Sequence, residues 1–428
     1  MEIIIEDLNY HVAHEDLNAS HIKAGYSSNP YQLLRGIMSI VYHVILAVPS
    51  FFYRDYYQKL IPNKYVFLGF TVNNYRSLAP IQEKMECAAI YKLDDLPFKR
   101  VWIYALLFFP IVLLKYFRSS GYMRKAYASE FVSFSCSYGL YIEAKKILNR
   151  INPVMVIVAN DHSLYQRSFF KAAQRLGIKI AYVQHASVTE NFPLLEFDYA
   201  FLDGQESLDK YTANNKICKS NVFLCGSPRF DIIKSLNIKA ISLKNKCGIA
   251  INSADSLDKI AELIWELQGV DNIITIRIHP SMDEKFWRTF ANKNNCFFSD
   301  AKTENPFQFI AQNDFFIAGE SSFHLDVSLT GKISFFYNFT DKPLRDHYSY
   351  LKNGLIKVLP NDFVQIEHYK NDCKQRAILI QYYVSNYDTL FWGKAAEVIR
   401  DTVLSLIESN KVPDFWKLEY CGVYTLKE

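Results

Sequence analysis

Apolar and polar positions alternate in a regular way from residue 64 to residue 229. Short β-branched or aromatic runs are followed by amphipathic stretches, as in PVMVIVAN (153–160) and SLYQRSFFKAAQRLG (163–177), which ends in Gly. This alternation predicts strands and helices in turn, and hence a parallel sheet covered on both faces. The predicted strands of this region are 64–70, 87–93, 153–160, 178–185, 197–204 and 222–229.

The pattern breaks over residues 226–246, which are polar and basic, and resumes afterwards. We place the interdomain linker there. Strands are predicted at 246–253, 272–280, 295–300, 314–322 and 332–338, and helices at 256–269, 283–293, 306–313, 323–331, 364–385 and 391–410. The expected fold is α/β and GT-B-like, with two Rossmann-like domains facing a cleft and extra N-terminal and C-terminal helices. The expected domains are 1–235 (with membrane-associating helices), 236–385 and a helical tail, 386–428.

Two apolar stretches, 36–53 and 101–117, are at or below the length of a membrane-spanning helix and are interrupted by His43 or Pro110. Lys and Arg flank the second stretch. Three interpretations stay open: a spanning helix, a helix lying in the membrane interface, and a buried core helix. The first is the least favoured.

Composition narrows the class of protein. Half of the 428 residues are hydrophobic and 21% are charged, which excludes a disordered chain. The net charge of +4 does not favour a nucleic-acid binder. Eight cysteines are spread singly without zinc-ligand spacing, and the acidic N-terminus lacks the features of a secretory signal. A reduced, cytoplasmic compartment is expected.

Ligands bind at the carboxyl ends of strands in open parallel sheets, so polar residues that follow strands are the candidate site residues. In the first domain, Asn160, Asp161 and His162 follow one strand, and Gln184 and His185 follow the next. We predict that His185 takes a proton from an acceptor hydroxyl, with Asp161 as a second catalytic residue. Asp161 or His162 is the alternative for the same role.

In the second domain, Ser321 and Ser322 stand where a helix begins, and His279 follows what we expect to be the neighbouring strand. Helix N-termini and small hydroxyls favour anions. The predicted donor-phosphate site is therefore His279, Ser321, Ser322 and Arg277. Residues predicted to contact the donor nucleotide or to order the loops are Glu320, Asp326, Asn252 and Ser253.

Pro228, Arg229 and Asp231 lie where the chain leaves the first domain, and are predicted to form a hinge. No D-x-D triplet, P-loop, G-x-G-x-x-G or H-E-x-x-H motif is present. We therefore expect no metal site and no cofactor, with leaving-group charge met by His, Ser, Arg and helix dipoles.

Four short motifs carry a family resemblance: VQHA (183–186), GSPRFD (226–231), RIHP (277–280) and ESS with a following Asp (320–326). Together they resemble the metal-independent GT-B glycosyltransferases of bacterial surface-polysaccharide synthesis, especially CDP-glycerol glycerophosphotransferase-like and capsule-type enzymes. The resemblance implies phosphate binding by His279, Ser321 and Ser322, a base at His185 and an inverting outcome. Ala186 replaces the usual Gly.

The predicted function is transfer of a sugar or polyol phosphate from a nucleotide-activated donor to a surface glycan or lipid-linked acceptor. The resemblance favours a CMP- or CDP-linked donor. The alternatives are a nucleotide-sugar 2-epimerase of the same fold and a non-catalytic partner in capsule assembly. No nucleic-acid partner is expected. The expected location is cytoplasmic and peripheral, at the inner face of the cytoplasmic membrane.

Overall fold

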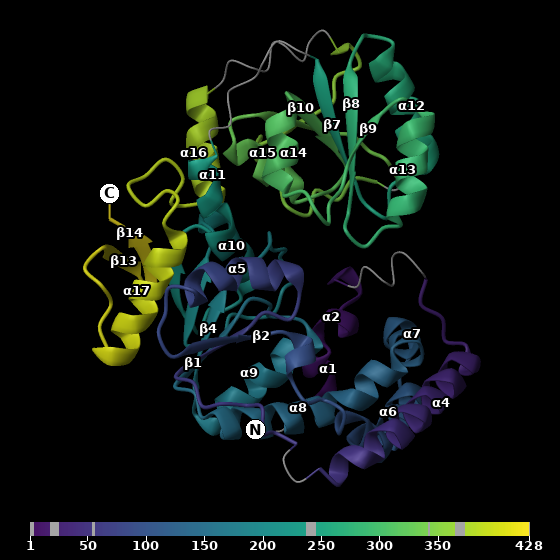
Figure 1. Ribbon diagram of the computed structural model, residues 1–428, viewed down its shortest axis with the longest axis vertical. Coiled ribbons are helices and arrows are strands. Elements are labelled where there is room, and N and C mark those ends of the chain that lie inside the picture. The colour runs from purple at the N-terminus through teal and green to yellow at the C-terminus, as the bar shows by residue number, and fades with distance from the viewer. Residues whose placement is uncertain are drawn as a thin grey trace. The chain divides into compact units, whose positions relative to one another are not determined.

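The computed structural model describes residues 4–17, 25–53, 56–236, 245–340, 343–363 and 373–427, and it contains two compact α/β units (Figure 1). The first unit comprises residues 1–203, 207–229 and 394–427, and the second comprises residues 204–206 and 230–393. The chain therefore passes from the first unit into the second at residues 229–230 and returns at 393–394.

The sheet of the first unit has eight strands in the order β13-β14-β6-β5-β4-β3-β1-β2. All neighbouring strands are parallel except the antiparallel pair β13–β14. This confirms the predicted parallel arrangement. The strands are β1 (Tyr65–Leu68), β2 (Ala88–Tyr91), β3 (Met155–Val158), β4 (Lys179–Val183), β5 (Tyr199–Leu202), β6 (Asn221–Leu224), β13 (Trp416–Tyr420) and β14 (Val423–Leu426).

Hydrophobic burial explains why the middle strands are apolar throughout. All four residues of β3 are buried, because helices cover both faces of a parallel sheet. The helices of this unit are α1 (Ile5–Leu8), α2 (Tyr10–Ala13), α4 (Pro30–Ala47), α5 (Val72–Gln82), α6 (Val101–Arg118), α7 (Gly121–Ser129), α8 (Phe131–Ile151), α9 (Leu164–Leu176), α10 (Gln205–Thr212) and α17 (Ala395–Glu408). Short 3-10 turns lie at η1 (Glu15–Leu17), η2 (Val48–Phe51), η3 (Leu93–Asp95), η4 (Ala213–Asn215) and η5 (Pro228–Phe230).

Local signals set two of these helices. Asn29 accepts a hydrogen bond from the Tyr31 amide and Pro30 follows it, so α4 begins there. Gly177 ends α9 in the left-handed conformation, with φ of 69°, as the Gly stop predicted. Glu130 separates α7 from α8, because it leaves the helical conformation with φ of −111° and ψ of 30°.

The second unit contains a six-stranded parallel sheet in the order β12-β11-β10-β7-β8-β9. Its strands are β7 (Lys246–Ile251), β8 (Ile273–Ile278), β9 (Phe297–Ser299), β10 (Phe315–Ala318), β11 (Ile333–Phe336) and β12 (Lys357–Val358). Its helices are α11 (Asp231–Ser235), α12 (Leu257–Gln268), α13 (Glu284–Lys293), α14 (Pro306–Gln312), α15 (Phe323–Leu329) and α16 (Cys373–Tyr383).

The C-terminal region differs from the helical tail that we predicted. A helix forms at α17, but the chain continues into β13 and β14, and β14 pairs with β6 in the sheet of the first unit. Trp416 explains this addition, because its ring packs on Phe223 at 4.9 Å and its Nε1 donates to Thr402 Oγ1 at 2.8 Å. Residues 237–244 of the predicted linker and 364–372 of a predicted helix lie outside the described residues.

Candidate active-site residues

The carboxyl end of β3 places Asp161 and His162 in direct contact. Asp161 is 2% exposed, and its Oδ1 lies 2.7 Å from Nδ1 of His162. The hydroxyl of Tyr211, on α10, donates to the other carboxylate oxygen at 2.6 Å and lies 3.1 Å from the hydroxyl of Tyr182. The buried carboxylate thus has the hydrogen bonds that burial of a charge requires.

The pKa of Asp161 follows from these partners. Burial alone would raise it, but the hydrogen bond and charge of His162, with the Tyr211 hydroxyl, outweigh burial and lower the pKa. An ionised Asp161 can only accept, so Nδ1 of His162 carries a proton, and Nε2 is the acceptor in the neutral form of the ring. Nε2 lies 3.4 Å from Asn160 Nδ2. A carboxylate-oriented imidazole of this kind is suited to general-base chemistry.

Asn160 fixes the loop that carries the pair. Its Oδ1 accepts hydrogen bonds from the amides of His162 and Ser163, at 3.0 and 2.6 Å, immediately before α9. Its own amide donates to Gln166 Oε1 at 2.6 Å. The rotation of His162 is therefore constrained from its backbone as well as from its ring.

His185, the predicted base, lies after β4 and belongs to the same cluster. Burial, and then the charge of His162, lower its pKa to about 4. The imidazole is therefore neutral near pH 7, and its buried Nδ1 has no hydrogen-bond partner among the described residues. A base with so low a pKa is weaker than one that titrates near the working pH. Its neighbour Gln184 is bonded to the amide of Asp203 and the hydroxyl of Ser207, each at 2.9 Å.

The N-terminal segment adds His11, which the sequence analysis did not select. The amide of His11 donates to the carbonyl of His162 at 3.2 Å, and the two rings are 5.3 Å apart. Burial lowers the pKa of His11 to about 4. Phe192 also packs against His162, with ring centroids 4.6 Å apart. Residues 1–17 show no periodic pattern that would place His11 in a helix or strand. The only sequence signal for His11 as a site residue is that it is a histidine.

Arg167 holds this segment in place. It pairs with Asp7 of α1, and its Nη1 donates to the carbonyl of Asp161 at 2.9 Å. The charges of Arg167 and Lys171 overcome the effect of burial and lower the pKa of Asp7. Through one guanidinium, the first helix of the chain is thus connected to the loop that carries the Asp161–His162 pair.

The predicted hinge residues lie at the division between the units. Pro228 and Arg229 form the short turn η5, and Asp231 begins α11. Arg229 Nη2 lies 3.4 Å from Asp203 Oδ2. The partner seen for Arg229 is therefore a residue at the end of β5, and a hinge function stays a prediction.

In the second unit, three strand ends carry the predicted donor residues, but their order differs from our expectation. We expected His279 and the serine pair to follow neighbouring strands. Strand β7 instead lies between β8, which precedes His279, and β10, which precedes Ser321. The prediction of adjacency was wrong, because order along the chain does not give the order of pairing in a doubly wound sheet. Asn252, at the end of β7, occupies the middle position.

His279 is exposed and is oriented by Ser281. Its Nδ1 lies 2.8 Å from the Ser281 hydroxyl and accepts from the Ser281 amide at 3.3 Å. With Nδ1 as acceptor, the ring proton is on Nε2, so even the neutral imidazole can donate a hydrogen bond to an anion.

The serine pair precedes α15, a helix of seven residues. The hydroxyl of Ser321 accepts from the amide of Phe323 at 3.3 Å, and Ser322 makes no side-chain capping bond. Ser321 therefore caps the start of α15, and the side chain of Ser322 does not take part in capping. Phosphate binding by both stays a prediction.

Asn252 and Glu320 brace the loops beside these residues. The side-chain Nδ2 of Asn252 donates to the carbonyl of Glu320 at 3.3 Å, and the backbone amide of Asn252 donates to Asp255 Oδ2 at 2.7 Å. Glu320 Oε1 accepts from the amide of His347 at 2.6 Å, which supports the loop-ordering alternative for Glu320. Burial raises the pKa of Asp255 to about 6.

The remaining predicted residues have different surroundings. Arg277 is 7% exposed, and its guanidinium donates to Ser299 Oγ and the carbonyl of Glu304 at 2.7 and 2.8 Å. These bonds hold β8 against β9 and occupy the guanidinium, which does not favour its contact with a phosphate. Phosphate binding by Arg277 stays a prediction. Ser253 is exposed and Asp326 is partly buried in α15.

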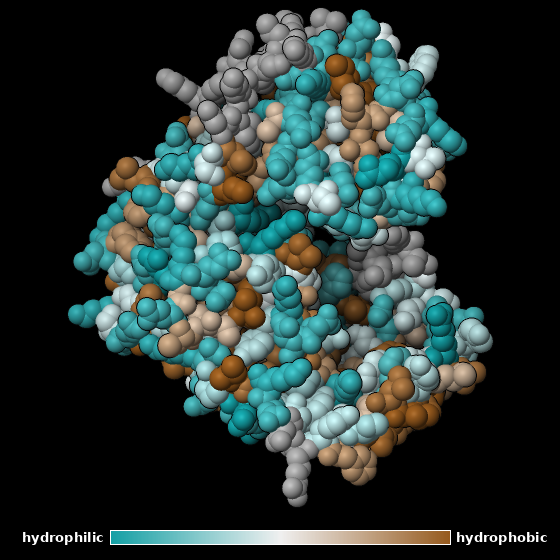
Figure 2. Space-filling model, viewed as in Figure 1, coloured by the Kyte–Doolittle hydropathy of each residue, from teal (hydrophilic) through white to brown (hydrophobic). Residues whose placement is uncertain are grey.

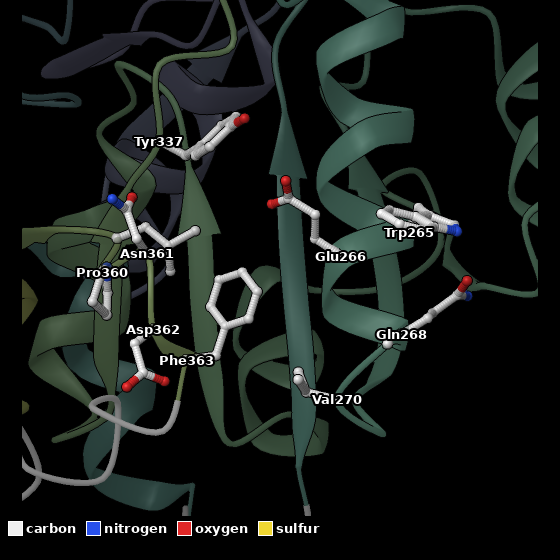
Figure 3. Close-up of a pocket in the computed structure, with 11 residues that line it drawn as sticks. Trp265, Glu266, Gln268, Val270, Tyr337, Pro360, Asn361, Asp362 and Phe363 are labelled. Carbon is white, nitrogen blue, oxygen red and sulfur yellow. The ribbon is translucent and has the colours of Figure 1, made fainter.

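A pocket of about 790 Å³ lies elsewhere in the second unit (Figure 3). It extends from Tyr337, after the carboxyl end of β11, to Val270, before the amino end of β8. None of the predicted site residues lines it. Its other lining residues are Trp265, Glu266, Gln268, Gly269 and residues 359–363. Within the described ranges, no group of three or more His, Cys, Asp or Glu side chains is placed to hold a metal ion.

Comparison with known proteins supports the fold. No family model and no curated protein matches the sequence. Solved structures do match: a UDP-N-acetylglucosamine 2-epimerase aligns with 13% identity and a TM-score of 0.51, over 83% of this chain and 99% of that one. The UDP complex of S. aureus MnaA aligns with the same identity and TM-score, over 82% and 99%. The wall teichoic acid polymerase TagF aligns with 13% identity and a TM-score of 0.47, over 87% and 98%.

Identities this low establish likeness of fold and nothing more. The chain is therefore an α/β protein with two Rossmann-type domains, as in the GT-B-like fold. This confirms the fold class predicted from the sequence, whereas a cleft between the two domains stays a prediction.

Proposed function

We propose that the protein is a transferase that moves a sugar or polyol phosphate from a nucleotide-activated donor to a hydroxyl of a surface glycan or lipid-linked acceptor. The observation that carries the proposal is the Asp161–His162 pair, a buried carboxylate that orients an imidazole at the end of β3. Fold likeness supplies no chemistry, so the argument rests on these side chains.

In this proposal His162 is the general base. Nε2 takes the proton of the acceptor hydroxyl while the acceptor oxygen forms a bond to the reacting atom of the donor, which is the anomeric carbon of a sugar or the phosphorus of a polyol phosphate. The bond from that atom to the adjoining phosphate oxygen of the nucleotide breaks, and the nucleotide leaves with the bonding electrons. Asp161 stabilises the imidazolium that results, because its carboxylate is negatively charged and accepts a hydrogen bond from Nδ1–H.

His279, Ser321 and Ser322 are the proposed donors to the leaving phosphate, and a CMP- or CDP-linked donor is the proposed substrate. Nε2–H of His279 suits this role because Ser281 occupies Nδ1. His185 is the alternative base. If His162 is the base, the neutral ring of His185 makes a single hydrogen bond with the acceptor substrate.

A nucleotide-sugar 2-epimerase is the second candidate. A structure of that name shares the fold with a TM-score of 0.51, and a histidine base could also remove a proton from carbon. An epimerase needs no acceptor hydroxyl, so the two candidates consume different substrates.

One experiment separates them. The purified protein is incubated with CMP-, CDP-, UDP- and GDP-linked donors, with and without a glycan acceptor, and the products are followed by mass spectrometry and NMR. If the protein is a transferase, the amount of free nucleotide released should increase with the concentration of acceptor. Conversion of a nucleotide sugar to its C2 epimer without acceptor would overturn the transferase proposal, and binding without turnover in every arm would favour a non-catalytic role. The same assays with EDTA test the expected independence of metal ions.

A further inference from the structure

Helix α4 has one face in the core and the other exposed. Leu33, Gly36, Ile40 and Ala47 are buried, and Leu33 and Ile40 belong to the hydrophobic cluster that α4 shares with α6, α7 and α8. The opposite face carries apolar side chains at helical spacing that are 45–70% exposed. They are Tyr31, Leu34, Met38, Val41, Tyr42, Ile45 and Leu46.

Helix α6 repeats this arrangement. Val101, Ala105, Val112 and Tyr116 are buried in the same cluster. Leu107, Ile111, Leu114 and Phe117 are 47–64% exposed and recur every three or four residues. Because α4 packs against α6, the exposed residues of both helices form one apolar surface, which we call the α4–α6 face. Figure 2 shows brown surface over this part of the molecule, where Figure 1 places α4 and α6.

The burial of these helices separates the interpretations left open by the sequence. Only 28% of the apolar window of 30–50 and 22% of that of 101–118 is buried, whereas a core helix would be mostly buried. A spanning helix, in turn, would have to withdraw its buried residues from the cluster with α7 and α8. A large exposed apolar surface on an otherwise well-packed protein marks a site of interaction.

The charges around the face indicate the partner. Residues 27–53 and 97–129 contain no Asp or Glu, but they contain Arg35, Lys99, Arg100, Lys115, Arg118, Arg124 and Lys125. Arg35, Arg118, Arg124 and Lys125 are exposed. Basic residues beside an apolar helix face attract anionic lipid headgroups. Tyr31 and Tyr42 have the amphipathic character that suits headgroup depth.

We propose that the α4–α6 face inserts in the plane of an anionic bilayer, so that both helices lie in one leaflet and neither spans it. The proposal rests on these helices alone, and it holds or fails independently of the transferase assignment. If both are correct, the protein meets a lipid-linked acceptor at the surface where that acceptor resides.

The test is co-sedimentation of the full chain with vesicles of phosphatidylglycerol and phosphatidylcholine, compared with vesicles of phosphatidylcholine alone. The double variant Met38→Glu with Leu107→Glu should bind the anionic vesicles at least 10-fold more weakly, because two charges would enter the apolar layer. Ile217→Glu, at a side chain 76% exposed in the same unit but off the face, should bind as wild type does. Wild-type binding should also fall with added salt.

Each other result overturns the proposal. Wild-type affinity in the double variant would exclude the face, and equal binding to both vesicle types would exclude selection by charge. Resistance to carbonate extraction would indicate spanning helices. Concentration-dependent dimerisation that the double variant abolishes, without vesicle binding, would assign the face to a second copy. Both substituted residues are exposed, so the double variant should unfold at the same temperature as wild type. Thermal unfolding therefore serves as the control for correct folding.

Discussion

The carboxyl edges of the two sheets present polar groups in opposite ways. At the first sheet, Asp161 is buried, and His162 and Tyr211 each make a hydrogen bond to one of its two carboxylate oxygens. At the second sheet, His279 is exposed and is oriented by Ser281 of its own loop. A buried pair is pre-organised to move a proton, whereas an exposed oriented donor can bind an anion that arrives from solution.

The largest expected effect comes from breaking the buried pair. Asp161→Asn and His162→Asn should each reduce the transfer rate by about 10²-fold or more, because the imidazole loses its orientation or its basic nitrogen. Nucleotide affinity should stay unchanged in both. Measured initial rates and nucleotide dissociation constants check this. His14→Asn, at an exposed histidine of the same unit, is the control.

His185→Asn sharpens the assignment of the base. If His162 is the base, His185→Asn should be less damaging than His162→Asn. The opposite order would return the role to His185, as the family resemblance implied.

A smaller effect is expected at the second sheet. His279→Ala should weaken binding of the preferred nucleotide by about 10-fold, because one hydrogen bond to a charged group is lost. His279→Gln, which keeps an N–H donor, should recover part of the affinity. Isothermal titration of CMP, CDP and UDP measures this, with Thr289→Ala of α13 as the control. Unchanged affinity in His279→Ala would remove His279 from the donor site.

The smallest effect concerns Asp255, which lies beside the loops of the second sheet. Its pKa is raised from 3.8 to about 6 by burial, so its contribution to stability is full below pH 3.8 and is lost as pH rises through 6. As the pH rises from 4.5 to 7.5, the free energy of unfolding of wild type should therefore fall relative to that of Asp255→Asn. The expected difference is about 1 kcal/mol once the partial exposure of Asp255 is considered. Urea unfolding at both pH values measures the difference. A difference independent of pH would show that Asp255 titrates normally.

Most of the fold could be predicted because strands such as 155–158 and 315–318 are continuous apolar runs between amphipathic helices. The C-terminal strands could not, since Lys417, Leu418, Glu419 and Tyr420 are exposed and give no apolar run. The buried Trp416, with its partners Phe223 and Thr402, and the pairing of β14 with β6 connect them to the first unit.

The candidate site was predictable only to the level of strand ends. Asp161 and His162 were found because they follow a strand, but their contact depends on side-chain rotation that no pattern encodes. Tyr211 looks like a core residue at helical spacing from Leu208, and its buried hydroxyl becomes informative only when Asp161 is seen beside it. His11 is separated from His162 by 150 residues, and contacts of that range need the tertiary fold.

The pairing of β14 with β6 bears on the order in which the chain can fold during synthesis. Residues 230–393 emerge as one continuous segment and contain every strand of the second sheet. The first sheet is complete only after residue 426 has left the ribosome, because two of its strands, β13 and β14, follow the whole second unit in the sequence. Until then, the edge of β6 stays open to pairing with other chains, so nascent molecules are most vulnerable to misassembly at that edge.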